Sequence, residues 1–202
     1  MIFRRISALC LLFPIFLSVA AQESHMIRVF FRYGSIPVQG YEDSEYAEMG
    51  GMYGGHVSIG LDSLEIGFDH TKGVHLFNHE RVRHSIFYSE PIRQFESEIK
   101  DKKYVTFFVP ITDEQYDQLK GILQEYMKQT PYDYAFFGMR CASATYDVLS
   151  QIGLFPPLSR NKNIYSNFYP KLFRRKMFKL AKEKQYTIIR QRGRLTRIWD
   201  ED

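Results

Sequence analysis

The feature that most limits how this chain can fold is a pair of short, apolar-rich segments with almost nothing between them. Residues 56–61 (HVSIGL) and 64–69 (LEIGFD) are separated only by Asp62-Ser63. Two strand-like segments joined by a two-residue turn predict a β-hairpin. The sequence therefore predicts that at least part of the fold is an antiparallel sheet.

The turn also predicts which residues face each other across this hairpin. If Leu61 pairs with Leu64, every outward step keeps the same register, and His56 falls opposite Asp69. Directly opposed residues share one face of the sheet, with their Cβ atoms about 5 Å apart. We therefore expect the Asp69 carboxylate to accept a hydrogen bond from the His56 ring. A shift of one residue in the turn would place a neighbour of Asp69 there, and Asp69 could also be an ordinary strand-end residue.

Other strands and helices are predicted on both sides of the hairpin. Further strand candidates are residues 27–33, 73–77, 85–88 and 103–109. Thr112 and Gln115 form a capping-box pattern at the start of a helix that ends near residue 130. A second helix begins at or near Cys141, and a basic helix at about 169–184 precedes a strand at 186–190. The glycine-rich loop 34–55 is either a mobile lid or a simple surface loop.

The N-terminus predicts export from the cell. Arg4 and Arg5 precede an apolar run, and residues 18–21 (SVAA) offer small side chains for cleavage. The alternative is a membrane anchor, but the run is shorter than the about 20 residues that span a bilayer. We expect residues 1–21 to be a signal peptide. Residues 22–202 would then form one periplasmic or extracellular domain without a membrane span.

Removal of this signal peptide would leave Cys141 as the one cysteine of the mature chain, because Cys10 lies within the leader. A single cysteine cannot form an internal disulfide, so Cys141 is either a functional thiol or an inert buried side chain. A thiol in the first turn of a helix faces unpaired backbone N–H groups and the positive end of the helix dipole. Both favour the thiolate, which is the nucleophilic form.

The sequence offers one preferred base for this thiol. The chain has six histidines, and His56 opens a strand directly after the glycine pair Gly54-Gly55. The other histidines lie near the new N-terminus, in loops or near strand ends. We therefore predict that Cys141, His56 and Asp69 form a catalytic group of nucleophile, base and orienting acid.

Two stretches of the chain resemble a known family. GGHVSIGL at residues 54–61 and YDYAFFGMRCASATYDVLSQIG at residues 132–153 are similar to the circularly permuted papain-like branch of the NlpC/P60 superfamily. That branch includes the lecithin:retinol acyltransferase-like and YiiX-like proteins. Its members carry the histidine strand, often written Gly-His, before the cysteine helix. The chain departs from the family where Met139-Arg140 stands before the cysteine, since many members have an asparagine there.

The resemblance implies a fold, a chemistry and a wider set of site residues. The implied fold is α+β, with an antiparallel sheet packed against the helix that carries the nucleophile. The implied chemistry is amide or ester cleavage through an acyl-enzyme, with no cofactor and no metal. Gly55, Tyr132, Tyr134 and Arg140 would surround the substrate and the oxyanion. The third catalytic residue varies within the family, so the resemblance leaves Asp69 open.

The expected function is that of an exported cysteine hydrolase of the amidase or peptidase type. Its substrate would be a peptide, a cell-wall fragment or a lipid-derived acyl group. The alternatives are a non-enzymatic envelope-binding module on the same fold, and a lipid acyltransferase or thioesterase. A metal-binding role for the histidines is disfavoured by their scattered spacing.

The charge of the chain is concentrated near its C-terminus. Residues 160–197 contain 13 Lys and Arg residues, with Glu183 as the only acid. On the predicted basic helix, Arg174, Arg175, Lys179 and Lys182 would form a polar face opposite an apolar stripe. This face is either simply solvated or attracted to an anionic envelope surface. Nucleic acid is not expected as a partner.

Overall fold

The protein has an α+β fold built on a mainly antiparallel sheet. The computed structural model describes residues 23–45 and 51–202, so the predicted signal peptide lies outside the described residues. The strands are β1 (Glu23–Tyr33), β2 (Ser35–Pro37), β3 (Gly55–Leu61), β4 (Leu64–His70), β5 (Ser85–Pro91), β6 (Tyr104–Thr112), β7 (Thr187–Gln191) and β8 (Arg197–Trp199). The helices are the 3-10 turn η1 (Gly51–Tyr53) and α1 (Ile92–Glu98), α2 (Asp113–Lys128), α3 (Cys141–Gln151), α4 (Arg160–Ser166) and α5 (Pro170–Lys184).

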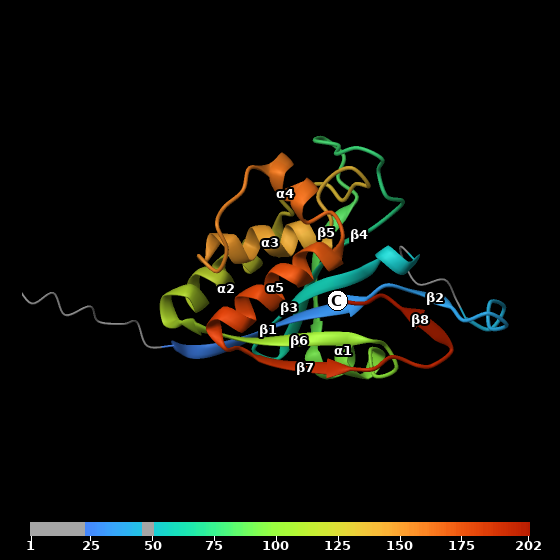
Figure 1. The fold of residues 1–202 in the computed structure, drawn as a ribbon. Coiled ribbons are helices and arrows are strands. Elements are labelled where there is room, and N and C mark those ends of the chain that lie inside the picture. The colour runs from blue at the N-terminus through green and yellow to red at the C-terminus, as the bar shows by residue number, and fades with distance from the viewer. Residues whose placement is uncertain (1–22, 46–50) are drawn as a thin grey trace, which may run out of the picture.

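Six strands form the main sheet in the order β5-β4-β3-β1-β6-β7, and β2 pairs separately with β8 (Figure 1). Every strand pair in both sheets is antiparallel. The helices α2, α3 and α5 lie on one side of the main sheet, and the short α1 lies on the other (Figure 1). Within the described ranges, no helix is long and apolar enough to cross a bilayer.

The predicted hairpin is confirmed in its register. Leu61 pairs with Leu64, and the ladder continues outward to Ser58 and Gly67. Beyond that pair the two strands are no longer bonded to each other, although His56 and Asp69 continue the same count. Asp69 instead pairs with Ile86 on β5. The hairpin is therefore open at the end that carries both predicted site residues.

The two faces of the sheet differ because side chains alternate along each strand. One face carries Val57, Ile59 and Phe31, which are buried in the main core together with side chains of α2, α3 and α5. The other face carries His56 and Ser58 and is covered by a small cluster of Phe30, Ile92, Phe95 and Ile99 around α1. The alternation thus sends His56 and its neighbour Val57 to opposite sides.

The helices that were predicted from capping and spacing are present. The Thr112 hydroxyl accepts from the backbone N–H of Gln115, and the Gln115 side chain accepts from the Thr112 N–H, which closes the capping box. Helix α3 begins at Cys141 as expected. The basic helix is also present as α5, but Arg174 does not lie on its polar face. Arg174 is buried and paired with Asp200 and Asp202, because the end of the chain folds over it.

The strand that was predicted at residues 73–77 is wrong. This segment belongs to an irregular loop between β4 and β5, with a single isolated bridge between His75 and Ala135. The loop takes its shape from the buried carboxylate of Asp133. That carboxylate accepts from His75 Nδ1 and from the backbone N–H groups of His79 and His84. A partner 58 positions away along the chain therefore overrides the local strand pattern.

Candidate functional site

Cys141 is the first residue of α3, and its side chain is 4% exposed. The backbone N–H groups of Val57 and Ala142 lie close enough to the sulfur to favour its charged form. Burial raises the pKa of the Cys141 thiol, and the nearby Arg140 and these two N–H groups only partly oppose it. The helix N-terminus therefore surrounds the sulfur with donors, while burial keeps it protonated near neutral pH.

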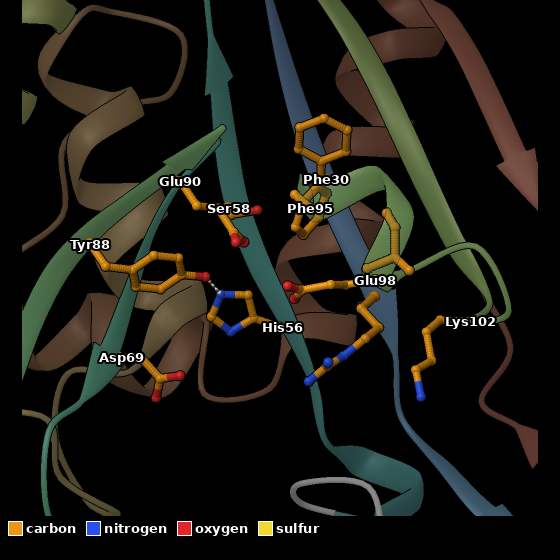
Figure 2. Close-up of a pocket in the computed structure, with 11 residues that line it drawn as sticks. Phe30, His56, Ser58, Asp69, Tyr88, Glu90, Phe95, Glu98 and Lys102 are labelled. Atoms are coloured by element: carbon orange, nitrogen blue, oxygen red, sulfur yellow. Dashed lines mark hydrogen bonds between the residues drawn. The ribbon is translucent and has the colours of Figure 1, made fainter. Parts of the chain in front are cut away.

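His56 lies at the start of β3 and lines a cavity of about 350 Å³ on the α1 side of the sheet. Figure 2 shows its ring pointing toward Tyr88, and His56 Nε2 lies 3.1 Å from the Tyr88 hydroxyl. Burial, with a smaller contribution from Arg32, lowers the pKa of His56 to about 4, and Asp69 opposes this shift. The imidazole is therefore neutral near pH 7.

The thiol and the imidazole are carried by neighbouring stretches of backbone. One of the two N–H groups that lower the pKa of the thiol belongs to Val57, which directly follows His56. The His56 ring itself points into the cavity on the other side, and the described structure records no hydrogen bond between it and Cys141. The bonded ladder between β3 and β4 ends at Ser58 and Gly67, before this level is reached. The backbone beside His56 thus reaches the thiol, while the imidazole lies in the cavity on the other side of the sheet.

Asp69 lines the same cavity as His56, but it does not hold the His56 ring. Its Oδ1 accepts from the backbone N–H of His70 at 2.7 Å and lies 2.6 Å from His70 Nδ1. Asp69 still acts on both predicted partners through its charge, since it influences the pKa of His56 and that of Cys141. The predicted hydrogen bond from His56 to Asp69 is therefore replaced by one to Tyr88.

Tyr88 and Glu65 are site residues that the sequence did not reveal. The Tyr88 hydroxyl donates to Glu65 Oε1 at 3.3 Å, while also contacting His56 Nε2. With its proton directed at Glu65, the Tyr88 oxygen accepts from a His56 Nε2–H. That tautomer leaves Nδ1 as the basic nitrogen of the ring. The chain Glu65–Tyr88–His56 can therefore orient the imidazole as an acid residue does in other catalytic groups.

Glycine makes this arrangement possible. Tyr88 on β5 is paired with Gly67 on β4, and Gly67 is paired with Ser58 on β3. A Cβ at Gly67 would lie 2.5 Å from the Tyr88 hydroxyl oxygen, so only glycine lets the ring cross β4 to reach His56. In the sequence LEIGFD, Gly67 lies two residues after Glu65 and two residues before Asp69. This glycine was the sequence signal that a side chain from another strand could cross β4.

Glu65 is fully buried at the end of this chain of hydrogen bonds. Burial, aided by the nearby carboxylate of Glu90, raises the pKa of Glu65 to about 7. Burial and the charge of Glu98 also raise the pKa of Glu90. Glu65 Oε2 and the Ser58 hydroxyl are buried without a hydrogen-bond partner. Glu65 therefore changes charge near neutral pH, and Glu90, which lines the cavity, takes up a proton more readily than an ordinary glutamate.

The remaining predicted site residues fall into two groups. Gly55 has a φ of +102°, and a Cβ there would lie 2.2 Å from the Arg32 carbonyl oxygen, so the turn into β3 requires glycine. Tyr134 is buried, and burial followed by the charge of Cys141 raises the pKa of its hydroxyl, which places it near the thiol. Tyr132 lies farther away: its hydroxyl contacts Asp147, six positions along α3 from the thiol.

Arg140 precedes the thiol and is surrounded by aromatic rings. Its guanidinium lies 5.7 Å from the ring centre of Phe136, 4.9 Å from that of Phe168 and 5.8 Å from that of Tyr169. Its Nη1 is buried without a hydrogen-bond partner. Arg140 thus supplies positive potential at the start of α3 from inside a group of aromatic rings.

The described ranges contain no group of three or more His, Cys, Asp or Glu side chains that could hold a metal ion. Three histidines do lie closer together than their spacing suggested. The rings of His75 and His84 are stacked with centres 4.0 Å apart, and His79 lies beside them. The Nδ1 atom of each ring already has a hydrogen-bond partner in the loop. These partners are the Asp133 carboxylate for His75, the Val82 N–H for His79 and the Gly73 carbonyl for His84.

Comparison of the chain with protein-family models, with curated proteins and with solved structures finds no match.

Proposed function

We propose that the protein is an exported thiol-dependent hydrolase of the amidase or peptidase type, with a circularly permuted papain-like arrangement. Cys141 is its nucleophile and His56 is its base. The observation that carries the proposal is that the Val57 N–H lowers the pKa of the Cys141 thiol, because the thiol then lies beside the backbone that bears His56. The start of α3 adds the donors that an oxyanion needs.

The reaction begins from a neutral pair, since the pKa of the thiol is raised and that of His56 is lowered to about 4. His56 Nδ1 removes the thiol proton as the sulfur attacks an amide or ester carbonyl. The C–N or C–O bond then breaks, and the leaving group takes the proton from the imidazolium. Water hydrolyses the thioester, with His56 again accepting a proton, and the free thiol and a carboxylic acid are released.

A short movement at the open end of the hairpin is part of this proposal. The His56 ring occupies the cavity beside Tyr88, and its Nδ1 has to meet the sulfur past the last bonded pair of β3 and β4. Hydrogen bonds of catalytic groups often tighten only when substrate is bound. The chain from Glu65 through Tyr88 keeps the Nε2–H tautomer, so Nδ1 remains the proton acceptor.

A second function is favoured by the burial of the sulfur. Cys141 is 4% exposed and burial raises its pKa, as expected for an inert core cysteine. The protein would then be a non-enzymatic envelope-binding module that uses the cavity around His56 and Tyr88. This second function predicts that loss of the thiol leaves ligand binding at the cavity intact.

A generic acyl substrate distinguishes the two functions. Incubation with p-nitrophenyl butyrate should release p-nitrophenol and leave a butyryl group on Cys141, which intact-mass measurement detects. The variants Cys141→Ser and His56→Ala should lose at least about a hundredfold in rate. The variant His79→Ala, which changes an exposed histidine in the loop between β4 and β5, should react normally. Equal rates in all four proteins would support the binding module instead.

A further inference from the structure

One end of the molecule presents a cluster of aromatic side chains, all of them exposed except the half-buried Phe168. Phe77, Phe136, Phe137, Tyr165 and Phe168, hereafter the aromatic end, come from three separate segments. The ring centres of Phe77 and Phe137 are 5.5 Å apart, those of Phe136 and Phe137 are 4.8 Å apart, and those of Phe136 and Phe168 are 5.8 Å apart. Phe77 is 65% exposed, Phe137 51% and Tyr165 77%. Contiguous exposed apolar surface of this kind marks an interaction site.

The aromatic end is held in place by the backbone. The loop between β4 and β5, the loop before α3 and helix α4 lie at the same end of the molecule (Figure 1). The N–H of Phe136 donates to the His75 carbonyl at 2.7 Å, and the N–H of Phe137 donates to the Leu76 carbonyl at 2.9 Å. Buried Asp133 fixes the first loop from below. Backbone hydrogen bonds therefore fix the two loops that carry Phe77, Phe136 and Phe137, with these rings exposed to solvent.

The segments that carry these rings also carry an excess of exposed positive charge. The same three segments expose the basic residues Lys72, Arg81, Arg83, Arg160 and Lys162. Glu80 is the exposed acid among them, while Asp133 is buried and bonded to the loop. Aromatic rings beside Lys and Arg suit the boundary between water and an anionic bilayer, where rings enter the headgroup layer and cations bind lipid phosphates.

We propose that the aromatic end docks the protein onto the surface of an anionic phospholipid bilayer. Phe77, Phe137 and Tyr165 enter the interface, while the basic side chains bind the headgroups. The surface adjoins the candidate nucleophile, since Arg140 contacts Phe136 and Phe168 and directly precedes Cys141. Docking would therefore hold the start of α3 close to the membrane. The proposal does not depend on catalysis by Cys141.

Vesicle co-sedimentation of the full mature chain tests this proposal. The protein should sediment with vesicles of equal parts phosphatidylcholine and phosphatidylglycerol, and much less with pure phosphatidylcholine or at high salt. The double variant Phe77→Ser, Phe137→Ser should lower the partition coefficient by at least about tenfold. Its matched control, Ile189→Ser with Leu195→Ser, removes two exposed apolar side chains elsewhere and should bind normally.

A second pair of variants tests the charges. Arg81→Gln with Arg160→Gln should weaken binding about fivefold per charge. Lys179→Gln with Lys182→Gln, on the exposed face of α5, should have little effect. Cys141→Ser should bind as the natural protein does, which separates this result from the fate of the proposed hydrolase.

Three results would overturn the proposal. They are a natural protein that does not sediment with anionic vesicles, serine variants at Phe77 and Phe137 that bind as tightly as it does, and binding that is lost with the α5 pair instead. A fourth contradicting result would come from light scattering. It would be the presence of dimers that the phenylalanine substitutions abolish and that anionic vesicles do not dissociate. Equal near-ultraviolet circular dichroism of all variants confirms that each one is folded.

Discussion

The two faces of the main sheet are built from the same strands but are used differently. One face is apolar from β4 to β6 and is sealed by three helices. The other carries the short helix α1 over part of it, and beside this helix lies the cavity that His56, Glu90 and Tyr88 line. Every residue step along β3 switches between these environments, so Val57 supports the core while His56 titrates in a pocket. The contrast indicates that the sealed face provides most of the stability, while the α1 face holds His56 with its lowered pKa.

The largest expected effect tests the stability of the sealed face. Phe31 is fully buried and packs against Phe107 and Phe173, with ring centres 5.7 and 5.3 Å away. Phe31→Ala should lower the free energy of unfolding by about 3–5 kcal/mol. Phe95 belongs to α1 and to the smaller cluster, is 9% exposed, and has a ring contact with Phe30. Phe95→Ala should therefore lower the free energy of unfolding by clearly less. Urea unfolding measures both, and equal losses would remove the distinction between the faces.

The next effect is a hidden pH dependence on the α1 face. The pKa of His56 is lowered from 6.5 to about 4, so acid in this interval favours the unfolded chain, which binds the extra proton. The pKa of Glu65 is raised from 4.5 to about 7, so here the folded protein holds the extra proton and rising pH favours unfolding. Each contribution reaches up to about 3 kcal/mol, and the two oppose each other where they overlap.

Single variants should separate these contributions. Of these two contributions, Glu65→Gln keeps only that of His56, so its own stability should fall as the pH falls from 6.5 to about 4. His56→Gln should lose stability as the pH rises from 4.5 to about 7. Thermal unfolding across this range measures both, with the exposed Glu125→Gln as control. Parallel profiles for all the proteins would show that neither group is perturbed by its surroundings.

A smaller effect concerns the crossing of Tyr88 over β4. Gly67→Ala would place a methyl group 2.5 Å from the Tyr88 hydroxyl oxygen, so the ring has to leave His56. We expect a loss of about 1–3 kcal/mol in stability and a changed His56 titration, measured by NMR of the ring. Gly121→Ala is the matched control. It adds a methyl group in open space on α2 and should raise stability by about 0.5–1 kcal/mol. An unchanged His56 signal in Gly67→Ala would show that Tyr88 does not hold the ring.

Features that depend on neighbouring residues were predictable from the sequence. The register of the hairpin followed from its two-residue turn, and the start of α3 at Cys141 followed from spacing alone. The partner of the His56 ring was not predictable, because Tyr88 belongs to β5, whose alignment with β4 is set across a long irregular loop. The same loop was mistaken for a strand because its organiser, Asp133, lies far along the chain. Local patterns thus predicted the strand and the helix that carry the candidate site residues. The contacts that those side chains make are decided by neighbours on other strands.

The most direct test of the central claim is whether the reactivity of Cys141 depends on His56. The rate of alkylation by iodoacetamide at pH 7 should be measured for the folded natural protein and for His56→Ala, with mass spectrometry to locate the adduct. If the imidazole removes the thiol proton during attack, the variant should react at least about a hundredfold more slowly. Equal rates in the two proteins, or reaction of Cys141 only after unfolding, would contradict the account.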